Sequence, residues 1–115
     1  MLTIEEQPSR HAVIVTVDAS PAVMDDLEGH ARSGLAWFAE FAGFVSGALH
    51  RSADGSRLVQ YLQWSDEASY LRCRDDARWD EMASAQLFMA HVEAGRATVD
   101  ERSYEVLRIV TNDDL

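Results

Sequence analysis

The pattern of apolar positions along the chain predicts four strands. They cover residues 11–17, 44–51, 57–64 and 102–111, and each contains the β-branched or aromatic side chains that strands favour. Asp54 and Gly55 lie between the second and the third strand, and this pair tolerates the backbone of a tight turn. These two strands are therefore expected to form an antiparallel hairpin.

Apolar positions at three- and four-residue steps predict two helical regions. The first begins with Ser20 as its N-cap and Pro21 at its first position, and Gly43 ends it. Its apolar stripe consists of Met24, Leu27, Ala31, Leu35 and Phe38, widened by Trp37 and Phe41.

The second helical region covers residues 65 to about 94. Ser65 is expected to cap it, the polar pair Asp75-Asp76 predicts a break, and Gly95 predicts its end. After the break, the inner stripe consists of Trp79, Met82, Ala85, Met89 and Val92. The predicted order is β-α-β-β-α-β, which is typical of an α+β, ferredoxin-like fold with its helices on one face of an antiparallel sheet.

The first and last strands are apolar on both faces, whereas a sheet with one wet face alternates apolar and polar residues. Val13, Val15 and Val17 oppose Ala12 and Ile14 in the first, and Tyr104, Val106 and Val110 oppose Leu107 and Ile109 in the last. Helices cover one face, so something else must cover the other. A second copy of the same sheet is the simplest cover, and we expect a homodimer packed sheet to sheet.

The length and net charge of the chain narrow the classes of function that it can have. The chain has 115 residues, which favours one domain over residues 1–115. Its formal net charge is -10, which argues against nucleic acid and anionic membrane surfaces as partners, and no apolar segment is long enough to cross a membrane. A single cysteine, Cys73, and an acidic start without a signal peptide predict a cytoplasmic protein.

Several motifs occur in order between residues 37 and 70. They are Gly43-Phe44-Val45-Ser46, His50, the Asp54-Gly55 turn, the strand Val59-Gln60-Tyr61-Leu62-Gln63-Trp64, and Tyr70 six positions after the tryptophan. This set resembles the antibiotic biosynthesis monooxygenase family, and is most similar to its small quinone-forming members of aromatic polyketide pathways. The resemblance covers most of the chain and implies a dimeric α+β barrel.

The resemblance also implies an activity. Such enzymes oxygenate a phenol or anthrone without any cofactor: the substrate loses a proton, the carbanion gives an electron to O2, and a quinone forms. Because the substrate carries the redox chemistry, neither flavin nor metal is required. His11, His30 and His91 show no metal-ligand spacing with one another or with Cys73, which is consistent with no metal site.

Gln60, Leu62 and Trp64 alternate along one strand and so share a face. The resemblance places Gln60 and Trp64 in catalysis, since an amide and an indole N–H can both stabilise an oxyanion. Gln60 stands where the family usually has Asn, and the first strand offers Thr16 rather than a second amide. The substrate-binding candidates are Tyr70, His50, Trp37, Phe38, Leu62, Trp79 and Met82, of which His50 is also a candidate base.

Three alternatives remain open. A cyclase or isomerase would use the same enolate-stabilising pocket without O2, and a non-catalytic module would bind a small ligand in the same barrel. Haem degradation needs a histidine on the second helix, and none lies between Ser65 and Asp80. Arg72, Arg74 and Arg78 form a basic cluster among acids, which we interpret as surface ion pairs.

Overall fold

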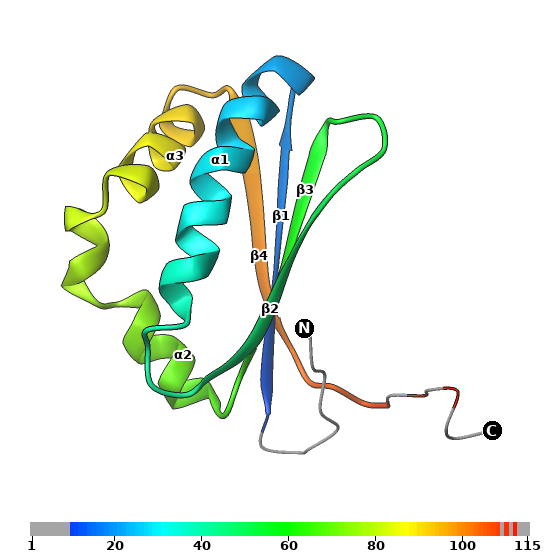
Figure 1. Ribbon diagram of the computed structural model, residues 1–115, viewed down its shortest axis with the longest axis vertical. Helices are drawn as coiled ribbons and strands as arrows, with labels where there is room; N and C mark the ends of the chain where they lie inside the picture. Colours follow the sequence, from blue (N-terminus) through cyan, green and yellow to red (C-terminus); the bar gives the residue numbers. More distant parts are fainter. Residues whose placement is uncertain (1–9, 109, 111, 113–115) are drawn as a thin grey trace.

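The computed structural model describes residues 10–108, 110 and 112, and its helices all lie on one side of the sheet (Figure 1). In chain order the elements are β1 (His11–Ala19), α1 (Pro21–Phe38), β2 (Phe44–Arg51), β3 (Arg57–Trp64), α2 (Glu67–Arg74), the 3-10 helix η1 (Ala77–Glu81), α3 (Ala83–Glu93) and β4 (Ala97–Tyr104). The four strands form one antiparallel sheet in the order β2-β3-β1-β4. The predicted α+β, ferredoxin-like fold is confirmed.

Helix α1 starts where the sequence predicts and stops earlier. The Ser20 hydroxyl accepts a hydrogen bond from the Val23 backbone N–H, and Pro21 is the first helical residue. The helix ends at Phe38, and two tight turns carry the chain on to Gly43. Gly43 has a φ of 89°, and a side chain there would collide with Ser69 on α2. Glycine therefore lets the loop after α1 pass close against α2.

The second helical region is divided into three short helices. Asp66, not the predicted Ser65, caps α2: its carboxylate accepts from the Ser69 backbone N–H at 2.8 Å. The predicted break is confirmed, because Asp76 caps η1 by accepting from the Arg78 backbone N–H at 2.8 Å. Asp66, and not Ser65, is the N-cap of α2 because Ser65 still belongs to the preceding loop. The Ser65 backbone N–H donates a hydrogen bond to the Gly43 carbonyl.

The predicted position of the last strand was wrong. Strand β4 covers Ala97–Tyr104 instead of 102–111, and it pairs with β1 from Ala19↔Ala97 to Ala12↔Tyr104. Residues 105–108 and 110 are not in a strand, and Leu107 and Val110 are 80% and 57% exposed. Partners on β1 run out at His11, so the apolar residues further along have nothing to pair with. Ile109 and Thr111 lie outside the described residues.

Two hydrophobic clusters fill the space between sheet and helices. The aromatic cluster consists of Val13, Phe41, Leu62, Trp64, Tyr70 and Cys73, with further aromatic side chains packed against it. The aliphatic cluster consists of Val17, Met24, Leu27, Leu58 and Ala97. Val15, in the middle of β1, packs against both. Among the described residues, no helix combines the length and the apolar character that spanning a membrane requires.

Candidate active site

The helix-facing side of the sheet places two polar side chains on either side of Val15. Val15 pairs with Gln60 on β3 and with Glu101 on β4, so the three form one row across neighbouring strands. Paired residues point to the same face of a sheet, and two strand spacings separate the outer members by about 10 Å. An amide and a carboxylate therefore flank an apolar floor.

A cavity of about 410 Å³ lies over this row, between the sheet and the helices. Its lining is mostly apolar and includes Val13, Phe38, Leu62, Phe88 and Met89. The polar side chains that line it are His30, Gln60, Tyr70, Arg74 and Glu101. An apolar hollow of this size with a few convergent polar groups is the usual form of a small-molecule site.

One face of α1 forms a wall of the cavity. His30, Gly34 and Phe38 follow one another at four-residue steps and all line it. Gly34 has no neighbouring atom within 4 Å of the place where a Cβ would stand. The absence of a side chain at Gly34 therefore keeps this part of the cavity open.

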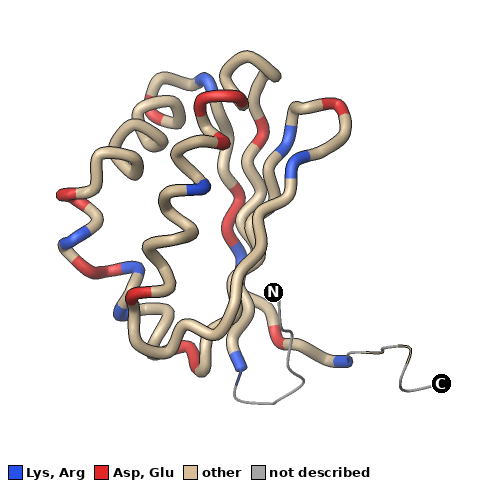
Figure 2. Tube along the Cα trace, in the orientation of Figure 1, with Lys and Arg blue, Asp and Glu red and all other residues tan. Residues whose placement is uncertain are grey.

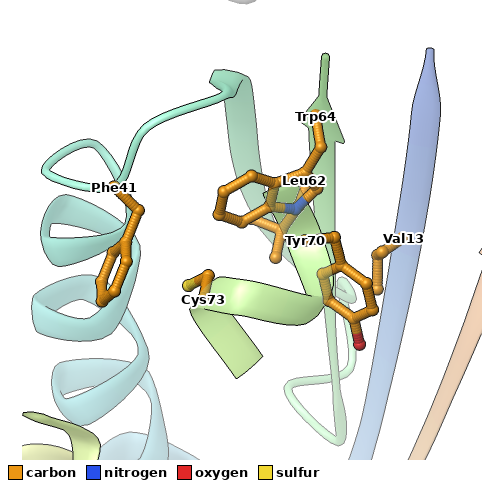
Figure 3. Close-up of a cluster of buried hydrophobic side chains, with 6 residues drawn as sticks. All are labelled: Val13, Phe41, Leu62, Trp64, Tyr70 and Cys73. Atoms are coloured by element: carbon orange, nitrogen blue, oxygen red, sulfur yellow. The ribbon is translucent and has the colours of Figure 1, made fainter. Parts of the chain in front are cut away.

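Trp64 lies behind the cavity wall and is not one of its lining residues. Its side chain is 0% exposed, and the rings of Phe44, Phe38 and Tyr70 lie 5.3, 6.0 and 6.0 Å from its own, measured between centroids. Figure 3 shows it at the end of β3, next to Leu62 and Tyr70. Within the described part of the chain its indole N–H has no acceptor. A buried donor without a partner is costly in free energy.

Tyr70 and Arg74 lie one turn apart on α2 and both line the cavity. The Arg74 guanidinium carbon is 5.8 Å from the centre of the Tyr70 ring, a distance at which a cation interacts favourably with an aromatic face. Tyr70 itself is buried and contacts the His11 ring at 5.2 Å between centroids. Arg74, which sequence analysis assigned to surface ion pairs, pairs with Asp75 and also borders the cavity.

Trp79 lines the cavity, but Trp37 and Met82 do not. The Trp79 indole N–H donates to the Cys73 carbonyl at 2.7 Å, which fixes its ring edge-on to Trp37 with 4.6 Å between centroids. Trp37 and Met82 instead border a separate hollow on the outer side of α1, together with charged side chains. Of the predicted lining residues, Gln60, Leu62, Tyr70, Phe38 and Trp79 meet at one cavity.

His50 lies on the other side of the sheet. Sequence analysis named His50 as a substrate-binding candidate and a candidate base, but the pairing of β2 with β3 shifts between Phe44 and Ser46. Phe44 pairs with Trp64 and faces the helices, whereas His50 pairs with Val59 on the open face and is exposed. The extra residue of this β-bulge exchanges the two faces for the rest of the strand. His50 therefore does not line the cavity.

Sequence analysis missed a pair of histidines joined by one carboxylate. The Asp26 Oδ2 atom lies 3.3 Å from His30 Nε2 and 2.6 Å from His91 Nε2. The hydrogen bond with His91 is the main reason why the pKa of the Asp26 carboxyl is lowered. Asp26 and His30 are four residues apart on one helix, a spacing that the sequence does show. The approach of His91 from α3 is visible only in the fold.

Glu101 carries the acidic group of the cavity. The residue is exposed, but the apolar surroundings partly desolvate its carboxyl and raise the pKa of that group by disfavouring the charged form. Figure 2 shows that the charged residues of both signs lie mostly on loops and helix ends, with acidic positions in the middle of β4. The predicted position of the last strand placed Glu101 in the loop before it, so no sequence pattern indicated a role.

The described residues contain no group of three or more His, Cys, Asp or Glu side chains able to hold a metal ion. The apolar lining of the cavity can bind a flat apolar molecule, and its polar side chains can donate hydrogen bonds to an oxygen on that molecule and accept a proton from it. These abilities rest on the amide of Gln60, the hydroxyl of Tyr70, and the bases His30 and Glu101.

Comparisons with known proteins show which proteins this chain is similar to. No family model matches the chain. Tetracenomycin-F1 monooxygenase of Streptomyces glaucescens is 29% identical over 79 residues, which are 68% of this chain and 70% of that protein. The crystal structure of SnoaB, a cofactor-independent oxygenase from Streptomyces nogalater, covers 89% of this chain and 97% of its own with a TM-score of 0.66 and 19% identity.

A third relative has the same fold. The structure described as a putative antibiotic biosynthesis monooxygenase from Nitrosomonas europaea covers 90% of this chain and 96% of its own, with a TM-score of 0.65 and 17% identity. At identities this low, the solved structures show that the fold is shared and nothing more. The sequence similarity to the Streptomyces glaucescens protein is an independent finding. Together they confirm the resemblance to the antibiotic biosynthesis monooxygenase family that the motifs indicated.

Proposed function

We propose that this chain, a relative of the antibiotic biosynthesis monooxygenases, oxidises a phenolic or anthrone-type aromatic polyketide to a quinone with O2 and without a cofactor. The observation that carries the proposal is the apolar cavity between sheet and helices, which has the size of a small-molecule site and only a few polar groups. The similarity to tetracenomycin-F1 monooxygenase supports the same class of substrate.

The reaction needs three things from the protein. A base must take a proton from the substrate, because the carbanion, and not the neutral anthrone, gives an electron to O2. A hydrogen-bond donor must stabilise the charge that then develops on the substrate oxygen, and the Gln60 amide lies where it can do so. The carbon then bonds to oxygen, the O–O bond breaks, and water leaves as the quinone carbonyl forms.

The apolar lining contributes by excluding water. In a dry pocket the hydrogen bonds to an oxyanion are stronger than in water, and the carbanion is not reprotonated by solvent. The direct catalytic role of Trp64 stays a prediction. The buried Trp64 ring packs against the rings of Phe38 and Tyr70, and these two rings line the cavity.

A second function uses the same groups. A cyclase or isomerase would also deprotonate a polyketide and stabilise its enolate, but would consume no O2. A ligand-binding module would do neither. The same cavity serves all three, so the measurement must follow O2 itself.

The test is O2 consumption by chelator-treated protein with a simple anthrone. Gln60→Ala removes one oxyanion donor, and such a loss typically lowers the rate about a hundredfold or more. Arg32→Gln changes an exposed side chain on α1 that does not line the cavity, and is expected to leave the rate unchanged. No uptake above the spontaneous rate, with the anthrone bound as judged by quenching of tryptophan fluorescence, would favour the cyclase or the binding module.

We also propose that a second copy of the chain covers the open face of the sheet. This face carries Ile14, Val59 and Tyr61, which are only half-buried, and the ion pairs Arg57–Asp18 and Arg102–Asp100. Because these charges are paired, two copies can meet here although the chain carries a net charge of -10. Sedimentation is expected to give the mass of two chains. Ile14→Arg should reduce the sedimentation mass to that of one chain. Ala36→Arg, on the exposed side of α1, should keep the mass of two chains. A wild-type protein with the mass of one chain would refute the proposal.

A further inference from the structure

The cluster around Asp26 fixes where the protons of two histidines lie. Arg96, in the turn between α3 and β4, donates from Nε to His91 Nδ1 at 2.9 Å. A guanidinium can only donate, so His91 Nδ1 must accept and the His91 proton must lie on Nε2. That proton points to Asp26, whose Oδ2 is 2.6 Å away.

The same carboxylate then determines the tautomer of His30. Asp26 is ionised and can only accept, and His30 Nε2 lies 3.3 Å from the same oxygen. His30 therefore carries its proton on Nε2 and has its free lone pair on Nδ1. This is the way in which a carboxylate orients the base in a Ser-His-Asp triad, with the roles of the two ring nitrogens exchanged.

His30 also belongs to the cavity, where its side chain is 17% exposed. The groups that face it are Asp26 on its own helix, His91 and Arg96 from the α3 side, and the cavity residues Tyr70, Arg74 and Glu101. Gln60 lines the same cavity from the sheet. A substrate in the cavity can thus meet the imidazole from one side and the amide from another.

We propose that His30, oriented by Asp26, is the base that takes the proton from the substrate in this cavity. The inference deepens the proposed function and rests on it for the kind of substrate. The C–H or O–H bond of the anthrone or phenol breaks, its electron pair stays on the substrate, and the proton goes to Nδ1 of His30. Asp26 stabilises the imidazolium that forms, and the proton later leaves with the water that the reaction releases.

Asp26 is a positioning residue in this scheme, because it acts through His30. His91 holds the carboxylate from α3, and Arg96 in turn holds His91 through its Nδ1 atom. An imidazole suits the task because its neutral form carries a free lone pair on one ring nitrogen and can act as a general base. Glu101 is the competing base. Partial desolvation raises the pKa of its carboxyl, which makes it a stronger base, but a carboxyl starts from a much lower pKa than an imidazole.

The decisive experiment follows proton transfer without oxygen. A hydroxyanthrone is bound under argon, and its ionised fraction is read from its visible absorbance between pH 5 and 9. In the wild-type protein we expect ionisation well below the pH at which the free compound ionises. His30→Gln keeps a polar side chain but removes the base, and should lower the ionised fraction at pH 7 at least tenfold.

Two further variants separate positioning from simple loss of charge. Asp26→Asn should move the ionisation profile of the bound ligand to higher pH, because the imidazolium loses its counter-charge. Asp25→Asn removes the neighbouring carboxylate, which pairs with Arg51 away from the cavity, and should leave the profile unchanged. Nitrogen NMR of the histidine rings should show His30 with its proton on Nε2 in the wild-type protein, and a mixture of tautomers in Asp26→Asn.

The outcomes distinguish this inference from the proposed function. Ionisation under argon that depends on His30, with no O2 uptake after air is admitted, would refute the oxygenase and leave the base in place. O2 uptake with ionisation unaffected by His30→Gln would overturn the inference. Loss of ionisation in Glu101→Gln with retention in His30→Gln would overturn it as well and assign the base to Glu101.

Discussion

The aromatic and aliphatic clusters lie between the same sheet and the same helices, yet they are built differently. The aliphatic cluster consists of small and medium side chains that are nearly inaccessible, and Met24 and Leu27 are fully buried in it. Its five buried members do not line the cavity. The aromatic cluster borders the cavity through Val13, Leu62 and Tyr70 and contains a buried indole N–H without a described partner.

This difference indicates a division of roles. Close packing without polar atoms gives stability, because each buried methylene contributes and no donor is left unpaired. Large flat aromatic rings pack with spaces between them. Their rigid side chains also hold polar groups, such as the Tyr70 hydroxyl, at fixed positions. The aliphatic cluster is therefore expected to anchor the helices to the sheet, whereas the aromatic cluster shapes a site.

Met24→Ala should give the largest effect on stability. It leaves a void in the aliphatic cluster, and substitutions of this kind typically cost about 2–5 kcal/mol. Equilibrium unfolding in urea measures the change in the free energy of unfolding. At a temperature where the variant is folded, its affinity for an anthrone should equal that of the wild-type protein. An altered affinity with little loss of stability would mean that the two clusters are not separate in function.

Gly34→Leu should weaken ligand binding and leave the stability of the fold unchanged. A leucine side chain would enter the open space beside Gly34, fill part of the cavity and weaken anthrone binding by more than tenfold, as judged by fluorescence titration. Stability should not fall, because glycine inside a helix is itself unfavourable by about 0.5–1 kcal/mol relative to alanine. Gly29→Ala is the matched control: it lies on α1, has equally open space and does not line the cavity. Unchanged binding in Gly34→Leu would show that the ligand lies elsewhere.

The smallest effect on stability is expected from the ionisation of Cys73 in the aromatic cluster. Burial raises the pKa of its thiol from the usual 9.0 to about 11. As the pH rises from 9 to 11, the unfolded chain releases this proton before the folded protein does. The free energy of unfolding should therefore fall across that range. In Cys73→Ala the fall should be shallower, and equal slopes in urea titrations of the two proteins would contradict the assigned burial.

Most of the fold could be predicted from local signals. The hairpin of β2 and β3 has the bounds that the sequence predicts, because its turn residues and β-branched runs are adjacent in the chain. The start of α1 at Ser20 and Pro21 depends on two neighbouring residues and was also predicted. Strand β4 was not, since its sequence, Ala97–Tyr104, is polar, and pairing with β1 selects it in preference to the more apolar residues that follow.

The candidate site shows the same division. Gln60 and Leu62 could be placed on one face from the period of the strand, and the family motifs indicated Tyr70. His50 could not be placed correctly, because the β-bulge before Ser46 that reverses its face leaves no clear mark in the sequence. Trp64 shares its face with Gln60, but only packing decides that Phe38, Leu62 and Tyr70 stand between it and the cavity.

The sequence by itself determined the order of the helices and strands and the bounds of the β2–β3 hairpin. These properties depend on contacts between near neighbours and on a pattern of apolar residues that can be counted along the chain. Only the tertiary structure decided that His30 and His91 share the carboxylate of Asp26, and that Glu101 faces Gln60 across Val15. The contact between Asp26 and His91 joins residues 65 positions apart, and distances of this kind follow from how helices and strands pack rather than from spacing in the chain.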